Sequence, residues 1–326
     1  MTSKNAPRTI LIDTDTASDD AVALIMALQS PLVSVAAITI VAGNVSVEQA
    51  TRNALYTAEL CDSPVPIYTG AAQPLVRELQ KAEWFHGVDG LGDHGYTPAT
   101  RRAESEHAVD AIIQTVLQNP GIEVITLGPL TNVALALARE PKIAANIRRC
   151  VVMGGAPCCE GNVTPAAEFN IWVDPEAART VFLSALPIEM IGWQLCRRQA
   201  ALNAEDIAAI LALNTERAEF AIHCNSTAAS AYHKQTGEHG ISLPDPVAMA
   251  ILLHPELSTS SSMHFVEIET ASELTRGMTV VDRLEVVADH RNRNVWREAQ
   301  IRGKKINVCW SLDIAGWKSA LLDALR

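Results

Sequence analysis

Apolar runs alternate with stretches of helical periodicity through the first two thirds of this 326-residue chain. The alternation predicts a parallel sheet with helices on both of its faces. Each run that we predict as a strand is followed closely by Gly, Asn or Asp, and open α/β sheets bind ligands at that end of their strands. The predicted strands lie just before Asp13 and at residues 33–42, 123–127, 150–153 and 187–192, and two predicted helices at 47–60 and 131–138.

The last third of the chain follows a different pattern. Residues 204–234 are Ala-rich and helical in periodicity, β-rich runs follow at 264–270, 278–281, 284–288 and 305–310, and a helix starts at Asp313. No linker-like segment, charge run or repeat divides the chain. We therefore predict one α/β domain over residues 1–326, with a mostly parallel central sheet, helices on both faces and a helical cap near the candidate site.

Composition narrows the class of protein. Hydrophobic residues make up 48% of the chain and charged residues 19%, which allows a large buried core. The net charge of −11 argues against nucleic acid and anionic membranes as partners and favours a small ligand. The apolar runs fall short of the roughly 20 residues that span a bilayer, and the N-terminus lacks an apolar signal segment, so we expect a cytoplasmic protein. Seven cysteines without zinc-type spacing fit a reducing compartment.

Four carboxylates, those of Asp13, Asp15, Asp19 and Asp20, fall within eight residues that contain no Lys or Arg. Two unit charges about 4–5 Å apart repel by roughly 3–4 kcal/mol at an effective dielectric constant near 20. A fold that gathers these acids therefore needs a bound cation or shifted pKa values. Asp13 and Asp15 share one face at the end of a predicted strand, and Asp19 and Asp20 open the following helix.

Two other interpretations of this acidic segment are open. An Asp at the start of a helix is a common N-cap, which accounts for Asp19 or Asp20 but not for the two acids at the strand end. A strand that ends in Asp-x-Asp also begins the haloacid-dehalogenase-type phosphatases, in which Asp13 would be the nucleophile. The pair Asp19 and Asp20 argues against that class, which needs no further carboxylates at the helix start.

Two later segments add candidate ligand-binding groups. Residues 84–96 are rich in Gly and predict an irregular loop, which is either a surface turn or a ligand-side loop that carries His86. The segment 161–176 combines Asn162, Glu168 and Asn170, whose side chains suit the hydroxyl groups of a sugar.

With these segments in order, the chain resembles the nucleoside hydrolase family, the inosine-uridine-preferring N-ribohydrolases. The resemblance spans most of the chain and rests on an ordered set of motifs rather than on one match. These are Asp13-Thr-Asp-x-x-x-Asp-Asp20, Gly43-Asn44, the loop that starts at His86, Gly128-Pro-Leu-Thr-Asn132, Val152-Met-Gly-Gly155, the segment 161–176, Asp245-Pro246 and the segment 275–282.

The resemblance implies Ca²⁺-dependent hydrolysis of the N-glycosidic bond of ribonucleosides to ribose and free base, in nucleoside salvage. It implies that Asp15 is the general base and that Asp13 supports the site from behind. The implied metal ligands are Asp15, Asp20, Asp245 and the Leu127 backbone carbonyl, an all-oxygen set of the kind that calcium prefers. The implied substrate-binding residues are Asp19 and Asn44 at the 2′-hydroxyl, Asn162, Glu168 and Asn170 at the other ribose hydroxyls, and Met153 and Trp193.

Two departures from the family pattern fall on the side of the base. Pro244 stands where many members carry a His that protonates the leaving base, and residues 193–198 replace a Leu-Asp-Val-Thr-like run. The candidates for the leaving-group acid are Cys196 and His86. We favour Cys196, because it lies in a segment that changes together with position 244.

Two alternatives to the hydrolase remain at this stage. One is the phosphatase that uses Asp13, and the other is a nucleoside-binding protein without turnover, which the missing His at position 244 suggests. The resemblance also implies a homo-oligomer, either a dimer or a tetramer.

Overall fold

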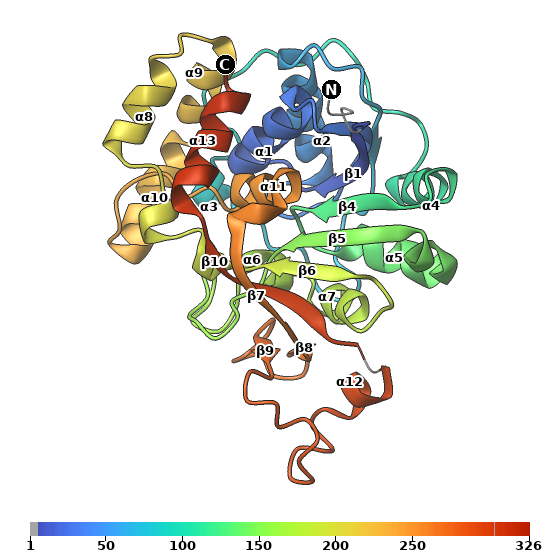
Figure 1. Ribbon diagram of the computed structural model, residues 1–326. Coiled ribbons are helices and arrows are strands. Elements are labelled where there is room, and N and C mark those ends of the chain that lie inside the picture. Colours follow the sequence, from blue (N-terminus) through green and yellow to red (C-terminus); the bar gives the residue numbers. More distant parts are fainter. Residues whose placement is uncertain (1–5, 303) are drawn as a thin grey trace, which may run out of the picture.

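An eight-stranded sheet forms the centre of the computed structural model, which describes residues 6–302 and 304–326 (Figure 1). The strand order is β3-β2-β1-β4-β5-β6-β10-β7, and only β7, at one edge, pairs antiparallel to its neighbour among these described strands. The strands are β1 (Arg8–Thr14), β2 (Val33–Ile40), β3 (Ile67–Thr69), β4 (Ile122–Thr126), β5 (Ile147–Met153), β6 (Ile188–Ile191), β7 (Ser258–His264) and β10 (Ile306–Leu312).

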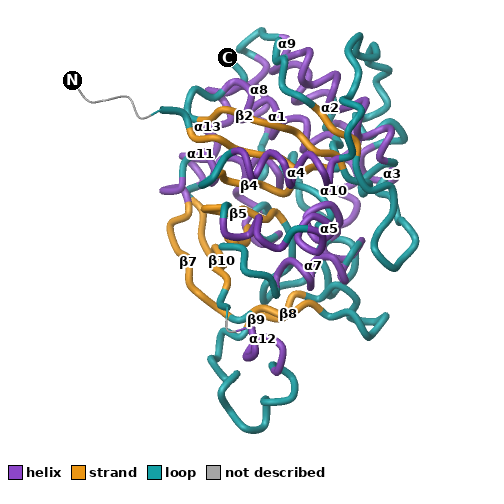
Figure 2. Tube along the Cα trace, turned by 90° about the vertical axis from the view of Figure 1, so that its right-hand side faces the viewer, coloured by secondary structure: helices purple, strands orange, loops and turns teal. Residues whose placement is uncertain are grey.

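Helices cover both faces of this sheet because the strands are apolar on both sides. On β1, Ile10 and Ile12 pack into one hydrophobic cluster and Leu11 packs into the other, as the two-residue period of a strand requires. The first cluster is covered by α1 (Ser18–Gln29), α2 (Val47–Leu60), α11 (Pro244–Leu253) and α13 (Ile314–Ala324), and the second by α4 (Ala108–Gln118), α5 (Thr131–Arg139) and α7 (Pro175–Phe182) (Figure 2).

The remaining elements stand around this core. A group of three helices, which we call the helical cap, consists of α8 (Ala204–Leu211), α9 (Glu216–His223) and α10 (Ser226–Thr236) and lies together on one side of the molecule (Figure 1). An arm over residues 265–302 projects at the bottom of the molecule in Figure 1 and contains β8 (Val266–Ile268), β9 (Thr279–Val281) and α12 (Arg297–Arg302). Short helices fill the loops: α3 (Glu83–His86), α6 (Phe169–Val173), η1 (Pro141–Ala145), η2 (Trp193–Leu195), η3 (Arg198–Ala200) and η4 (Pro255–Leu257).

The predicted α/β fold with its mostly parallel sheet is confirmed, and the helix predicted at 47–60 is α2. The strand predicted at 284–288 is wrong. Asp282 accepts hydrogen bonds from the backbone N–H groups of Val286 and Val287, both at 2.9 Å, so this segment folds into turns and its donors are unavailable to a neighbouring strand.

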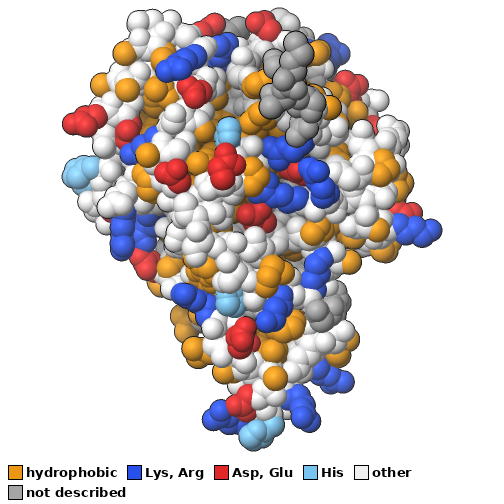
Figure 3. All heavy atoms as spheres, viewed as in Figure 1, with side chains coloured by type: hydrophobic (Ala, Val, Ile, Leu, Met, Phe, Trp, Pro, Cys, Tyr) orange, Lys and Arg blue, Asp and Glu red, His pale blue; other side chains and the backbone are white. Residues whose placement is uncertain are grey.

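Acidic and basic side chains are interspersed over the face of the described residues drawn in Figure 3. None of the helices in the described part of the chain combines the length and the apolar character that a membrane crossing requires.

Candidate functional site

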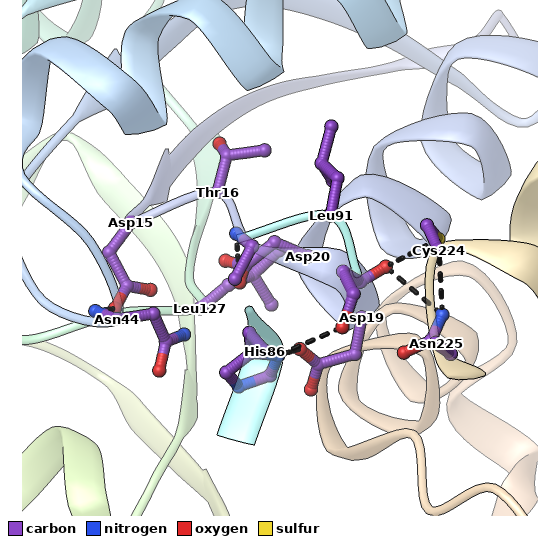
Figure 4. Close-up of polar contacts among 12 residues, drawn as sticks. Asp15, Thr16, Asp19, Asp20, Asn44, His86, Leu91, Leu127, Cys224 and Asn225 are labelled. Carbon is purple, nitrogen blue, oxygen red and sulfur yellow. Dashed lines mark hydrogen bonds and ion pairs between the residues drawn. The ribbon is translucent and has the colours of Figure 1, made fainter. Parts of the chain in front are cut away.

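Three carboxylates meet at the carboxyl ends of the central strands. Asp19 and Asp20 stand in the first turn of α1, and Asp245 stands in the first turn of α11, between two prolines. One oxygen atom of each carboxylate lies within 4.8 Å of one oxygen of the other two, and all three side chains are buried. Figure 4 shows Asp19 and Asp20 of this group beside His86. Positive ends of two helix dipoles therefore face this acid cluster, which we define as Asp19, Asp20 and Asp245.

Without a cation, these carboxylates hold on to their protons more strongly than usual. Burial, together with the charge of the other acids, raises the pKa of Asp20 to about 6 and that of Asp245 well above its ordinary value. Burial also raises the pKa of Asp19 to about 6. Within the described chain no Lys or Arg is paired with any of the three, so the cluster can ionise fully only when a positive charge binds to it.

Asp15 lies next to this cluster, in a space that two glycines leave open. Its Oδ2 atom accepts a hydrogen bond from the backbone N–H of Asn44 at 2.6 Å, and its Oδ1 atom has no hydrogen-bond partner among the described residues. A Cβ atom on Gly43 would lie 2.1 Å from Oδ2, and a Cβ atom on Gly128 would lie 2.7 Å from Oδ1. The glycines of the Gly43-Asn44 and Gly128-Pro129 motifs therefore make room for this carboxylate.

Asp13 lies on β1, two residues before Asp15, and it is not among the described residues that line the cavity. Its Oδ1 atom accepts hydrogen bonds from Thr39 Oγ1 at 2.6 Å and Asn132 Nδ2 at 2.9 Å, and burial raises its pKa to about 7. It thereby joins β1, β2 and α5 behind Asp15, which fits a supporting role.

The segment 161–176 places three polar side chains on the opposite wall. Glu168 is the N-cap of α6, and its carboxylate accepts hydrogen bonds from the N–H groups of Gly155 and Asn170, both at 2.8 Å. The Asn170 amide donates to Leu127 O at 2.9 Å, and Asn162 Oδ1 accepts from Phe169 N at 2.9 Å. These bonds fix the side chains before any ligand arrives, and burial raises the pKa of Glu168 to about 7.

A cavity opens between the acid cluster and this wall. Its lining contains every residue that we predicted to bind substrate, and also His86, Leu127 and Asp245. Three other predicted site residues, Asp15, Asp20 and Cys196, are fully buried and are not among the described lining residues. The predicted substrate-binding residues in the lining are Asp19, Asn44, Met153, Asn162, Glu168, Asn170 and Trp193.

Comparisons with known proteins agree with this geometry. The model of the family described as inosine-uridine preferring nucleoside hydrolase matches residues 10–317. The chain belongs to this family. It is 42% identical over 274 residues to the non-specific ribonucleoside hydrolase RihC of Salmonella enteritidis, with 84% of this chain and 87% of the relative covered. It is 35% identical over 308 residues to probable uridine nucleosidase 1 of Oryza sativa, with 94% and 92% covered.

A solved structure extends the comparison to the whole fold. The plant nucleoside hydrolase PpNRh1 superposes with a TM-score of 0.90 at 30% identity and covers 98% of this chain and 99% of its own. The family predicted from the ordered motifs is thus confirmed, and the chain is a nucleoside hydrolase, an enzyme that cleaves N-glycosidic bonds.

The residues of this family member fit a hard divalent cation. The acid cluster offers only oxygen donors, and Asp15 Oδ1 and Asp19 Oδ1 are buried with no hydrogen-bond partner within the described chain. Two of the three acids that we expected as metal ligands, Asp20 and Asp245, belong to the cluster. The third member of the cluster is Asp19 rather than the expected Asp15. Asp15 is nevertheless close enough to the cluster that its charge raises the pKa of Asp245.

The two candidates for the leaving-group acid occupy different environments. His86 lines the cavity, its Nδ1 atom lies 2.8 Å from Ser18 Oγ and 3.8 Å from Asp19 Oδ1, and burial lowers its pKa to about 4. Cys196 is fully buried outside the described cavity lining, 3.7 Å from Gly192 O, and burial raises its pKa well above the usual thiol value. Of the two candidates, His86 is the one that lies in the described cavity lining, whereas the favoured Cys196 does not.

Several lining residues were missed from the sequence. Trp84 and Phe85 precede His86 in the Gly-rich loop, and Gln235 and Ser242 come from the end of α10 and the segment before α11. Trp84 and Phe85 could have been found by their position beside His86. Gln235 carries no local signal, because its place in the wall depends on how the helical cap packs.

Proposed function

We propose that this protein hydrolyses ribonucleosides to ribose and free base with the help of one Ca²⁺ ion. The observation that carries the proposal is that Asp19 and Asp245 of the acid cluster line the same cavity as the sugar-binding set Asn44, Asn162, Glu168 and Asn170. A ribosyl group presents three hydroxyls, and this wall presents prearranged amide and carboxylate groups. The positioning of a bound sugar supplies a large share of catalysis in such reactions.

We infer that Asp20, Asp245, Asp15 and the Leu127 carbonyl would hold the cation, with Asp19 beside them. The observations in support are the mutual approach of Asp19, Asp20 and Asp245 and the unpartnered Asp15 Oδ1 atom. A bound Ca²⁺ supplies Lewis-acid chemistry, since a divalent cation makes a neighbouring water more acidic.

The roles of the chain's own groups follow from the charge changes of the reaction. Cleavage of a C1′–N bond passes through an oxocarbenium-like state, so positive charge develops on the sugar while a water molecule loses a proton. Asp15 accepts that proton at Oδ1, the atom with no partner in the described chain. Asp19 and Asn44 bind the 2′-hydroxyl, Asn162, Glu168 and Asn170 bind the other hydroxyls, and the carboxylates stabilise the developing cation.

We assign the departing base to the part of the cavity around His86, Trp193 and Pro244. Because burial keeps His86 neutral at pH 7, it can act there as a hydrogen-bond donor to the base through one ring nitrogen. Met153 and Trp193 supply apolar contact.

The phosphatase alternative has less support. Asp13 would be its nucleophile, but the family to which the chain belongs is that of the nucleoside hydrolases, and hydrogen bonds from Thr39 and Asn132 hold Asp13 Oδ1 in a supporting place. Its Oδ2 atom, like Asp15 Oδ1, has no hydrogen-bond partner among the described residues. A panel of nucleosides, with a phosphate monoester as control, separates the three functions. The proposal expects reducing sugar from nucleosides and no phosphate from the ester. Tight binding of a ribose analogue without sugar release would instead indicate a binding protein.

We further propose that the protein is a homo-oligomer, a dimer or a tetramer. The arm supports this, because Leu274, Leu284, Val295 and Ile301 on it are each at least 68% exposed, and exposed apolar groups of this size favour association. Sedimentation equilibrium measures the subunit number directly, and a monomer at micromolar concentration would contradict the proposal.

A further inference from the structure

A partly buried ionic network lies at the amino ends of the central strands, at the opposite end of the sheet from the cavity. Arg8 on β1 pairs with Glu123 on β4 at 2.8 Å, and Arg149 on β5 pairs with Glu189 on β6 at 2.6 Å. The Glu123 side chain is 3% exposed and the Arg149 side chain 16%. Ion pairs that are removed from water add little to the free energy of unfolding compared with well-packed apolar side chains. The function of this network is therefore better sought in the directions of its hydrogen bonds than in its charge.

Both arginines use their remaining donors on the end of α11. Arg8 Nη2 donates to the carbonyls of Leu252 and Leu253, both at 2.9 Å. Arg149 donates from Nη1 to Leu252 O at 3.2 Å and from Nη2 to Ile251 O at 3.1 Å. The last carbonyls of a helix have no partner within it, and a cation there interacts favourably with the helix dipole. We call Arg8 and Arg149, with these bonds, the arginine clamp.

The clamp acts on a helix that few other polar contacts hold in place along its axis. Residues 247–253 of α11 are apolar and buried, and they pack on α1, α13 and β5 (Figure 1). The hydrophobic effect is non-directional, whereas the hydrogen bonds from the two arginines are directional. At the other end the N-cap, Leu243, makes no side-chain capping bond.

That other end carries Asp245. The helix has ten residues and is therefore about 15 Å long, so a shift at its last turn is transmitted directly to its first turn. Asp19 and Asp20 stand on α1 and Asp245 stands on α11, so the distances within the acid cluster depend on where α11 lies relative to α1. The clamp fixes this placement, because its four hydrogen bonds anchor α11 to β1 and β5.

We propose that Arg8 and Arg149 are positioning residues that fix Asp245 relative to Asp19 and Asp20 and thereby set the affinity of the acid cluster for Ca²⁺. This inference rests on the cation site proposed above.

The chain offers a matched pair of variants for the test. Arg148 neighbours Arg149 and pairs with Glu123 of the same network, but its side chain is 58% exposed and it makes no hydrogen bond to α11 within the described residues. Ca²⁺ affinity is measured by calorimetric titration of the chelated full-length protein, well below its melting temperature. Arg149→Met should raise the Kd for Ca²⁺ about tenfold, the scale on which support behind metal ligands acts. Arg148→Met should change it less than twofold.

Activity supplies a second readout. If the clamp sets cation affinity, excess Ca²⁺ should restore the kcat of Arg149→Met, whereas general loss of structure would leave kcat low at any Ca²⁺ concentration. If Arg149→Met does not fold, Arg8→Met and Arg149→Lys repeat the test, because each removes part of the clamp. Equal Kd values for the Arg149 and Arg148 variants would overturn the inference. Failure of the wild-type protein to bind Ca²⁺ would overturn the proposed cation site as well, so the two failures are distinguishable.

Discussion

Asp15 is the residue on which the proposed chemistry most depends, because its Oδ1 atom has no hydrogen-bond partner among the described residues while Oδ2 is already bound by Asn44. We predict that Asp15→Asn lowers kcat by at least about two orders of magnitude, the usual scale for a general base. Steady-state ribose release from a good nucleoside substrate measures this. Asp62→Asn, at an exposed site, is the control. A kcat near that of wild type in Asp15→Asn would remove Asp15 from the base role.

The donor to the departing base can be identified by comparing two kinds of substrate. A riboside with a nitrophenol leaving group needs no proton, whereas a natural nucleoside does. We predict that His86→Ala slows natural nucleosides at least about tenfold more than the nitrophenyl riboside. Cys196→Ala should slow both substrates equally, because the thiol is buried outside the described cavity lining. Equal losses on the two substrates in His86→Ala would exclude it as the donor.

Strand-end loops are the elements that shape the space for Asp15. We predict that Gly128→Ala destabilises the protein by about 1–3 kcal/mol and lowers kcat, because the new Cβ atom would lie 2.7 Å from Asp15 Oδ1 and 2.9 Å from Asp15 N. The backbone contact leaves no flexible side-chain end to move aside. Chemical denaturation and ribose release together test this. An alanine variant with unchanged stability and unchanged kcat would show that the loop adapts.

Elements with strong local patterns were predictable from the sequence, and those with tertiary causes were not. The helix 47–60 follows from its N-cap Ser46 and its apolar face. Strand β7 was missed at 258–263 because its run of Ser and Thr is exposed at the sheet edge and shows no apolar alternation. Its pairing with β10 is the cause of its conformation, and that partner lies about 50 residues later.

In the site, too, residues in local motifs were predictable from the sequence, and residues placed by tertiary packing were not. The acids of α1 and the amide and carboxylate groups of 162–170 were predictable, because motif residues at strand ends converge on one rim of an α/β sheet. The place of Cys196 was not predictable, because the short helix η2 and the following turn bury its thiol against Gly192. Nor could the sequence place Gln235, which reaches the cavity from α10.

The stability of the whole molecule should depend on pH and on Ca²⁺ together. Burial raises the pKa values of Asp13 and Glu168 to about 7 and those of Asp19 and Asp20 to about 6, so the chelated native state binds more protons than the unfolded state. The lowered pKa of His86, about 4, acts in the opposite direction, but the four raised pKa values outweigh it, so we predict that stability falls as the pH rises from about 4 to 7. Ca²⁺ competes with these protons, so we predict that it raises the melting temperature more at pH 8 than at pH 5. Calorimetric scans with Ca²⁺ and with chelator measure the difference, and an equal effect at both pH values would contradict the prediction.

The most direct test of the account is ribose release by the whole enzyme, before and after the removal of divalent cations. We predict that the Ca²⁺-loaded protein releases one ribose for each base from at least one common ribonucleoside. Exhaustive chelation should abolish this turnover, and added Ca²⁺ should restore it. An unchanged rate after exhaustive chelation, or no ribose from any nucleoside of a full panel by the loaded protein, would contradict the account.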